Sequence, residues 1–160
     1  MILLTVGMQL GFDRLIEAMD KLAPSLEIPI IAQTGKGTYR PQNMEARERI
    51  GPAEFEELVK KSELIVSHAG IGTVLTAARF SKPILLVPRK ASLGEHRNDH
   101  QLATVRNLEG RPGILIAFDE NELLVRINEG LSMTDVMQAS SPDAQRLHSA
   151  VASFIETGTL

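Results

Sequence analysis

Four short segments carry the glycines, amides, hydroxyls and histidines with which this sequence could do chemistry. They span residues 7–11, 33–38, 68–73 and 88–101, and each directly follows an apolar run of strand length. Glycine lets backbone N–H groups approach an anion closely, and amides, hydroxyls and imidazoles can hydrogen-bond a sugar. These residue types in this arrangement predict a site for a phosphate and a sugar.

The sharpest of the four segments is Gly70-Ile71-Gly72-Thr73, which lies between an apolar strand and an expected helix. A helix N-terminus after a glycine turn attracts an anion, and Thr73 adds a hydroxyl donor. The same pattern also occurs as a tight strand-to-helix turn without a ligand. The residues alone leave both interpretations open.

Two better-known phosphate motifs are absent from the sequence. A Rossmann dinucleotide fingerprint needs G-x-G-x-x-G after the first strand, and residues 7–12 do not supply it. The segment 35–38 lacks the earlier glycine of a Walker loop, and Gly37 stands where Ser or Thr must follow the lysine. A P-loop ATPase and a dinucleotide-dependent dehydrogenase are therefore disfavoured.

Three histidines lie within these segments. His96 and His100 are four residues apart, so they share one face of the helix that we expect over residues 95–108. We favour a polar cleft over a metal pair, because Arg97 occupies the position of the glutamate in H-E-x-x-H and no third ligand is obvious. His68 directly follows a strand, where it either contacts a ligand or is a buried histidine bonded to the backbone.

The remaining charged residues show no catalytic arrangement. Asp13, Glu17 and Asp20 share a helix with Arg14 and Lys21, which is most simply a solvated face. No pair of carboxylates is spaced for acid and base work, and no nucleophile has an obvious base. The catalytic residues are therefore left unassigned.

Length and composition exclude several classes of protein. The 160 residues, 43% of them hydrophobic, suit one compact domain over residues 1–160. The absence of cysteine excludes disulfides and thiolate metal sites, and a net charge of -3 disfavours nucleic-acid binding. No apolar run reaches the length of about 18 residues typical of a transmembrane helix. Residues 1–7 resemble a first strand rather than a signal peptide, so we expect a cytoplasmic protein.

Strand-length apolar runs alternate with helical patterns along the chain. We expect strands at 2–6, 28–32, 64–66, 84–87 and 114–117, with a further short strand within 45–50. We expect helices at 12–22, 52–59, 72–80, 95–108, 119–127 and from 142 onward. This alternation predicts an α/β fold, with a Rossmann-like parallel sheet and helices on both faces. Ligands of such sheets bind beyond the carboxyl ends of the strands, where the four segments lie.

Several of these motifs, taken in order, point to a known family. They are Thr-Val-Gly at 5–7 with the helix start at 12–16, Gln-Thr-Gly at 33–35, residues 67–73, residues 82–89 and residues 94–103. Together they resemble the family 28 glycosyltransferase C-terminal domain over residues 2–131. The resemblance is closest to short stand-alone members, namely the catalytic subunit of the split UDP-N-acetylglucosamine transferase and bacterial exopolysaccharide counterparts. In that family this domain is the nucleotide-sugar half of a GT-B fold.

The resemblance implies transfer of a hexose or N-acetylhexosamine from a UDP-sugar to a lipid-linked or polysaccharide acceptor. It implies no bound metal or other cofactor, and a membrane-anchored partner subunit that supplies the acceptor half and the general base. The residues that it places at the donor are Gly7, Gln9, Gly11, Gln33, Gly35, His68, Gly70, Gly72, Thr73, Thr76, Arg89, Glu95, His96, Asp99, His100 and Gln101. Many full-length relatives carry a ribose-binding glutamate where this chain has Thr76, and a hydroxyl would bind ribose less strongly.

Two other interpretations stay open. Thr76 and the lack of an acceptor half favour a non-catalytic nucleotide-sugar-binding or regulatory subunit of a polysaccharide synthesis complex. A sugar-nucleotide epimerase-like domain shares the architecture, but the cleft of those enzymes needs two domains in one chain. A docking surface for the partner is expected on the C-terminal helix around Leu147, Val151 and Phe154, which would otherwise simply close the core.

Overall fold

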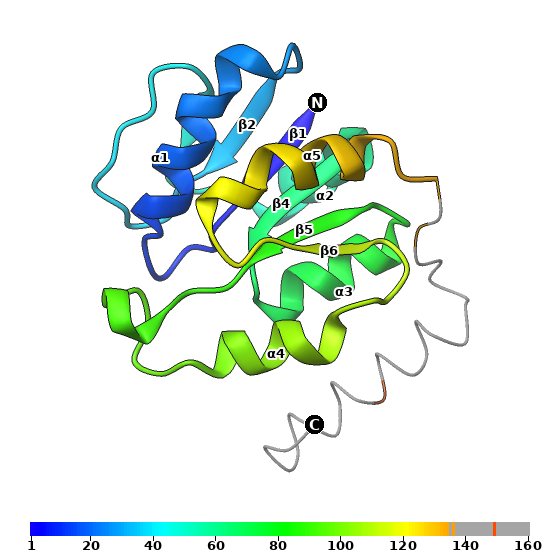
Figure 1. Ribbon diagram of the computed structural model, residues 1–160. Helices are drawn as coiled ribbons and strands as arrows, with labels where there is room; N and C mark the ends of the chain where they lie inside the picture. Colours follow the sequence, from blue (N-terminus) through cyan, green and yellow to red (C-terminus); the bar gives the residue numbers. More distant parts are fainter. Residues whose placement is uncertain (135, 137–148, 150–160) are drawn as a thin grey trace.

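The computed structural model of the chain describes residues 1–134, 136 and 149. Its centre is a six-stranded parallel sheet with the strand order β3-β2-β1-β4-β5-β6 (Figure 1). The strands are β1 (Ile2–Thr5), β2 (Ile30–Gln33), β3 (Glu45–Arg47), β4 (Leu64–His68), β5 (Ile84–Val87) and β6 (Ile114–Ile116). The helices are α1 (Asp13–Leu22), α2 (Pro52–Lys61), α3 (Ile71–Arg79), α4 (His100–Leu108) and α5 (Leu123–Leu131), with short 3-10 turns at Ala23–Ser25, Ala91–Leu93 and Glu120–Glu122.

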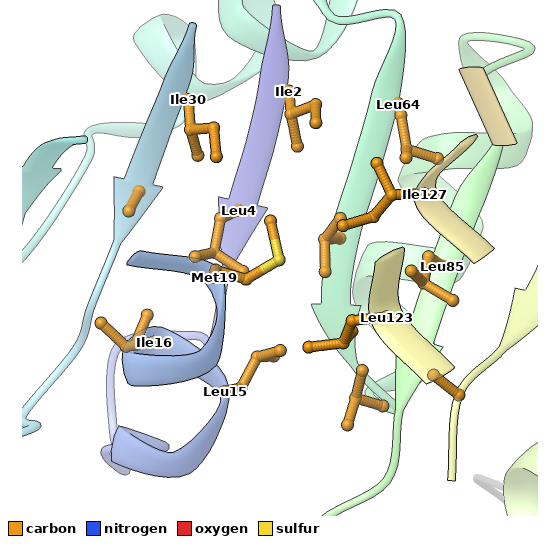
Figure 2. Close-up of a cluster of buried hydrophobic side chains, with 14 of the residues drawn as sticks. Ile2, Leu4, Leu15, Ile16, Met19, Ile30, Leu64, Leu85, Leu123 and Ile127 are labelled. Carbon is orange, nitrogen blue, oxygen red and sulfur yellow. The ribbon is translucent and has the colours of Figure 1, made fainter. Parts of the chain in front are cut away.

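Each face of the sheet is covered by its own helices, because successive strand side chains point to opposite faces. Ile2 and Leu4 of β1 pack with α1 and α5, as Figure 2 shows. Leu3, which lies between them, packs on the other face with α2, α3 and α4. Strands that are apolar on both faces are typical of parallel sheets between two helical layers. The predicted fold class, a Rossmann-like parallel sheet with helices on both faces, is confirmed.

Individual boundaries differ from the sequence expectations at two places that matter for the site. Strand β4 continues through His68, so this histidine is the last residue of the strand rather than part of a loop. Helix α4 begins at His100, five residues later than expected, so the start expected at residue 95 is wrong. The side chains of Glu95 and Asp99 instead accept hydrogen bonds from the backbone N–H groups of Lys90 and Ala91, which holds residues 95–99 in a bent segment.

Two further expectations concern the C-terminal part of the chain. The helix expected from residue 142, with the docking surface around Leu147, Val151 and Phe154, lies outside the described residues. In the part of the chain that the structure describes, no helix is both long and apolar enough to cross a membrane.

Candidate functional site

The chain reverses its direction of travel across the sheet at β1, which lies between β2 and β4. From β1 the chain first builds outward to β2 and β3, and it then returns to add β4, β5 and β6 on the other side. The loops that leave β1 and β4 therefore part in opposite directions and open a crevice at the carboxyl edge of the sheet. Such switch points are where open α/β sheets bind their ligands.

A cleft of about 450 Å³ occupies this switch point. Its walls are the loop after β1, the end of β4, the residue that follows Pro88 and the start of α4. Predicted site residues that the structure brings together here are Gly7, Gln9, His68, Gly70, Arg89, His96, His100 and Gln101. They come from three of the four polar segments, so the clustering predicted at the carboxyl edge holds for these three.

Arg89 is the structural centre of the cleft although it is only 4% exposed. Its Nη2 atom donates to the carbonyl oxygens of Val6, Leu10 and Gly11 at 2.9, 3.1 and 3.3 Å. Its backbone N–H donates to Oε1 of Gln101 at 3.1 Å, and its guanidinium carbon lies 5.2 Å from the centre of the Phe12 ring. Burial lowers the pKa of the Arg89 guanidinium, and the charge of Glu95 raises it in part.

His68 packs against two glycines that make room for its ring. A Cβ atom on Gly70 would collide with the imidazole, and one on Gly7 would lie 3.4 Å from Cε1. Burial, and after it the charges of Arg89 and His96, lower the pKa of His68 to about 4, although a hydrogen bond with the backbone of Thr5 opposes them. The His68 imidazole is therefore neutral at pH values near 7, with one nitrogen as donor and the other as acceptor.

His96 and His100 meet at the mouth of the cleft. Their ring centres are 4.5 Å apart and the planes are inclined by 71°, with His96 in the bent segment and His100 in the first turn of α4. Nδ1 of His96 is buried and has no hydrogen-bond partner among the described residues. Burial lowers the pKa of His100, and the charges of His96 and Arg97 lower it further. Over residues 1–134, no group of three or more His, Asp or Glu is arranged to hold a metal ion.

The N-terminus of α3 begins at the edge of the cleft. Gly70 is the residue before the helix, and no side chain caps the first turn among the residues described. Gly72 and Thr73 lie in that turn but do not line the cleft itself. The Thr76 hydroxyl donates to the carbonyl oxygen of Gly72 at 2.9 Å, so its proton is already used within the helix.

Other predicted site residues have partners within the fold. Gln33 is 4% exposed, and its Oε1 accepts a 2.7 Å hydrogen bond from the Thr5 hydroxyl. Gly11 and Gly35 bring the loops after β1 and β2 into contact, since a Cβ on either would meet backbone atoms of the other loop at 2.6 Å. These three residues shape the loops around the cleft, and their predicted contact with a donor stays a prediction.

Glu95 and Asp99 also bind within the fold. The Glu95 carboxylate pairs with Arg14 through two hydrogen bonds of 2.6 and 3.0 Å and also accepts from the N–H of Lys90. Asp99 accepts from the N–H of Ala91 at 2.8 Å and does not line the cleft. Both carboxylates thus hold the segment between β5 and α4 in place.

The apolar side of the cleft carries no clear signal in the sequence, and two acids of α1 have other surroundings than expected. Met8 and Leu10 line the cleft with side chains that are 54% and 46% exposed, and only their position in a glycine loop could have indicated this. Asp20 was expected on a solvated face, which is wrong because it is 2% exposed. It accepts from the backbone N–H groups of Gln42 and Asn43, so the loop after β2 is tied to α1.

Asp13 binds the same loop in the same way. Its carboxylate accepts from both the N–H and the hydroxyl of Thr38, so it is also no free member of a solvated face. Burial raises the pKa of Asp13, but the hydrogen bonds from Thr38 outweigh it, so the net pKa is lowered. Helix α1 therefore positions the second polar segment at the edge of the sheet.

A second hollow, of about 500 Å³, lies beside β2 and β3 and is slightly larger than the cleft at the switch point. Lys36, Arg40 and Glu48 are the charged residues along it. We place the site at the smaller cleft because the histidines, the neutral amide of Gln101 and the start of α3 converge there. The hollow contains no histidine, and Arg40 is bonded to its own loop through the carbonyl oxygen of Gly37.

The strand order and the position of the cleft define a Rossmann-like α/β domain with a ligand site at its switch point. The chain belongs to the family described as the glycosyltransferase family 28 C-terminal domain, whose model matches residues 1–154. Among solved structures it resembles an ALG13 solution structure with a TM-score of 0.60 at 15% identity, over 91% of this chain and 93% of that one. It also resembles the MurG of Acinetobacter baumannii with a TM-score of 0.56 at 23% identity, over 81% of this chain and 40% of that one. The domain has the fold of one half of a GT-B glycosyltransferase.

Curated relatives are similar over different lengths. A UDP-N-acetylglucosamine transferase subunit ALG13 of Cryptococcus neoformans is 42% identical over 48 residues, which are 29% of this chain and 24% of that protein. A UDP-N-acetylglucosamine--N-acetylmuramyl-(pentapeptide) pyrophosphoryl-undecaprenol N-acetylglucosamine transferase of Borreliella burgdorferi is 26% identical over 147 residues, or 90% of this chain and 38% of that protein. The match therefore spans well under half the length of either relative.

Proposed function

We propose that this chain is the donor-binding half of a glycosyltransferase that uses a UDP-sugar. The observation that carries the proposal is the cleft at the switch point, where the glycine loop after β1, neutral His68 and the start of α3 meet. Family membership supports it, as do the names of two relatives, which specify UDP-N-acetylglucosamine as donor. The sugar is a hexose or N-acetylhexosamine, and the acceptor is lipid-linked or a polysaccharide.

In the proposed reaction an acceptor hydroxyl attacks the anomeric carbon of the donor sugar. A glycosidic bond forms, the bond from that carbon to the diphosphate oxygen breaks, and UDP leaves with the electron pair. The first-turn amides of α3 and an N–H of neutral His68 would stabilise the negative charge that develops on the diphosphate. The UDP-sugar is a substrate, and the proposal includes no metal or other cofactor.

A membrane-anchored partner subunit completes the proposed enzyme. It supplies the acceptor half and the general base that removes the hydroxyl proton, and it brings this chain from the cytoplasm to the inner face of the membrane. Turnover tests this arrangement: UDP release from the donor and acceptor should require the candidate partner and this chain together. Full turnover by this chain alone would contradict the requirement for a partner.

Calorimetric titration with UDP, UDP-N-acetylglucosamine, UDP-glucose and NAD, without added metal, tests the donor site directly. We expect saturable binding of the UDP compounds and none of NAD. Gly72→Ala is a clean probe, because its Cβ meets nothing within 4 Å in the free protein, so a loss of affinity must come from close approach of the ligand. We expect a loss of about ten-fold, or about 1.4 kcal/mol.

The matched control for this probe is Gly51→Ala. Its Cβ is equally free of contacts, its φ of -66° suits alanine, and Gly51 precedes α2 without lining the cleft. Affinity for UDP should be unchanged in this variant. Equal affinity in the wild type and Gly72→Ala, or binding of NAD as tight as that of UDP, would contradict the proposed site.

A second candidate function is a nucleotide-sugar-binding subunit without catalytic activity. Thr76 favours it, since its hydroxyl proton is bonded to the Gly72 carbonyl and is not free for a ribose hydroxyl. Thr76→Glu distinguishes the two functions. A rise in both UDP affinity and turnover in the presence of the partner favours the enzyme, whereas tighter binding with no turnover favours the binding subunit.

A further inference from the structure

Arg89 directs its guanidinium away from solvent and toward the backbone of the loop 7–11. One nitrogen, Nη2, has the carbonyl oxygens of Val6, Leu10 and Gly11 within hydrogen-bond distance. These carbonyls belong to both ends of the loop, so one side chain closes it into a fixed curve. Arg89 reaches across from the end of β5, 83 residues further along the chain than Val6.

Collecting the carbonyl oxygens on one side also orients the N–H groups of the loop. In a planar trans peptide the C=O and the following N–H point in opposite directions. The N–H groups of Gly11 and Phe12 therefore point away from the guanidinium, because the carbonyls of Leu10 and Gly11 point toward it. The side of the loop that faces Arg89 is thus lined by carbonyl oxygens that a cation neutralises, and the N–H groups of Gly11 and Phe12, which face away from it, suit an anion.

The surroundings of Arg89 hold it in this role. Its backbone N–H is bonded to Gln101, and the ring of Phe12 lies against its guanidinium. Glu95, the acid whose charge raises the pKa of Arg89, is already paired with Arg14 through both carboxylate oxygens. Nε of Arg89 is buried and unpartnered within the described part of the chain, so the guanidinium is bound by neutral oxygens and its charge is not cancelled by a carboxylate.

We propose that Arg89 is a positioning residue, which shapes the loop 7–11 for the diphosphate of the donor and does not itself bind the diphosphate. The proposal rests on the proposed donor function and deepens it. It assigns a role to a residue that sequence resemblance alone places among the donor contacts. The low pKa of His68, to which the charge of Arg89 contributes after burial, agrees with an unneutralised guanidinium behind the cleft.

Two substitutions of Arg89 distinguish its role in shaping the loop 7–11 from the effect of its positive charge. Arg89→Lys keeps the positive charge, but the shorter lysine side chain places its ammonium closer to its own backbone than Nη2 of Arg89, so it should not reach the carbonyl oxygens at both ends of the loop. Arg89→Met removes the charge as well. We expect UDP affinity to fall about ten-fold in Arg89→Lys and about 100-fold in Arg89→Met, by calorimetry on the full chain. Arg97→Met is the control, since it removes an exposed arginine from the same segment and should leave affinity within about two-fold.

Urea unfolding shows first whether each variant is folded, and a structure of the wild type with UDP gives a test that needs no variant. In that complex Nη2 of Arg89 should keep its hydrogen bonds to the carbonyls of Val6 and Leu10. A guanidinium that leaves these carbonyls to pair with a phosphate overturns the proposal, as does wild-type affinity in Arg89→Lys. Failure of the wild type to bind any UDP compound would instead overturn the proposed function.

Discussion

His68 is the residue whose charge depends most strongly on its surroundings. Its pKa falls from an ordinary 6.5 to about 4, first because it is buried and then because of its electrostatic interactions with Arg89 and His96. Between these two values the unfolded chain takes up a proton that the folded chain refuses. The free energy of unfolding therefore falls as the pH drops through this window, and it is largest above it.

Replacing His68 tests this dependence. The wild type should lose about 1–2 kcal/mol of unfolding free energy between about pH 7 and pH 5 through this residue, and His68→Gln should lose that much less. Urea unfolding at the two pH values measures the difference. His100→Gln is the control, because His100 is exposed and its contribution should be smaller. If His68→Gln showed the same pH dependence of the unfolding free energy as the wild type, the lowered pKa of His68 would not be its cause.

At the scale of single residues, the site residues that directly follow strands could be predicted from the sequence. Residues whose hydrogen-bond partners lie far away along the chain could not. Gly7, His68 and Gln101 could be grouped because parallel strands end at one edge. Asp20 could not be assigned, because its partners are backbone N–H groups 22 and 23 residues away, which carry no sequence signal. The role of Arg89 could not be predicted for the same reason, because its partner Val6 lies 83 residues away.

At the scale of elements, the loops after β1 and β2 form one packed unit. Gly35 has a φ of +58°, and a Cβ there would lie 2.6 Å from the carbonyl oxygen of Gly7. The glycine is thus required twice, by its backbone conformation and by the close approach of the neighbouring loop. Movement of one loop must therefore move the other.

Gly35→Ala should be strongly destabilising for this reason. We expect a loss of about 1 kcal/mol from the positive φ and about 1–3 kcal/mol more from the clash with backbone. Gly94→Ala isolates the first contribution, since Gly94 has a φ of +68° and open space around its Cβ. Chemical denaturation of both variants gives the comparison. Equal losses in the two variants would show that the loops are not in tight contact.

Elements with an unbroken apolar pattern were predicted closely, and those bounded by polar side chains were not. The strand expected at 84–87 and the helix expected from Pro52 agree with β5 and α2. Helix α4 starts late because Glu95 and Asp99 bind nearby backbone N–H groups and so compete with helical hydrogen bonds. Helical periodicity alone carries no information about that competition.

At the scale of the whole molecule, a ligand at the switch point should stabilise the entire fold. The loops that form the cleft leave β1, β4 and β5, which are neighbours at the middle of the sheet. A ligand that binds only when these strands are in place must shift the unfolding equilibrium of the whole chain.

Thermal unfolding measures this coupling. UDP at about 100 times its dissociation constant should add about 2.7 kcal/mol to the free energy of unfolding. For a chain of this size that corresponds to a rise in Tm of about 5–10 °C. NAD at the same concentration is the control and should leave Tm unchanged, as should UDP with a variant that no longer binds it. A rise of equal size with NAD would contradict a site specific for UDP compounds.

The bond between Arg89 and Val6 also has a consequence for how the protein is made. A ribosome releases the loop 7–11 long before Arg89, which follows 83 residues after Val6. The loop therefore lacks its three bonds to Arg89 on a nascent chain until β5 has been made. Under the proposed function, a translation product that ends before β5 lacks Arg89 and should not bind the donor.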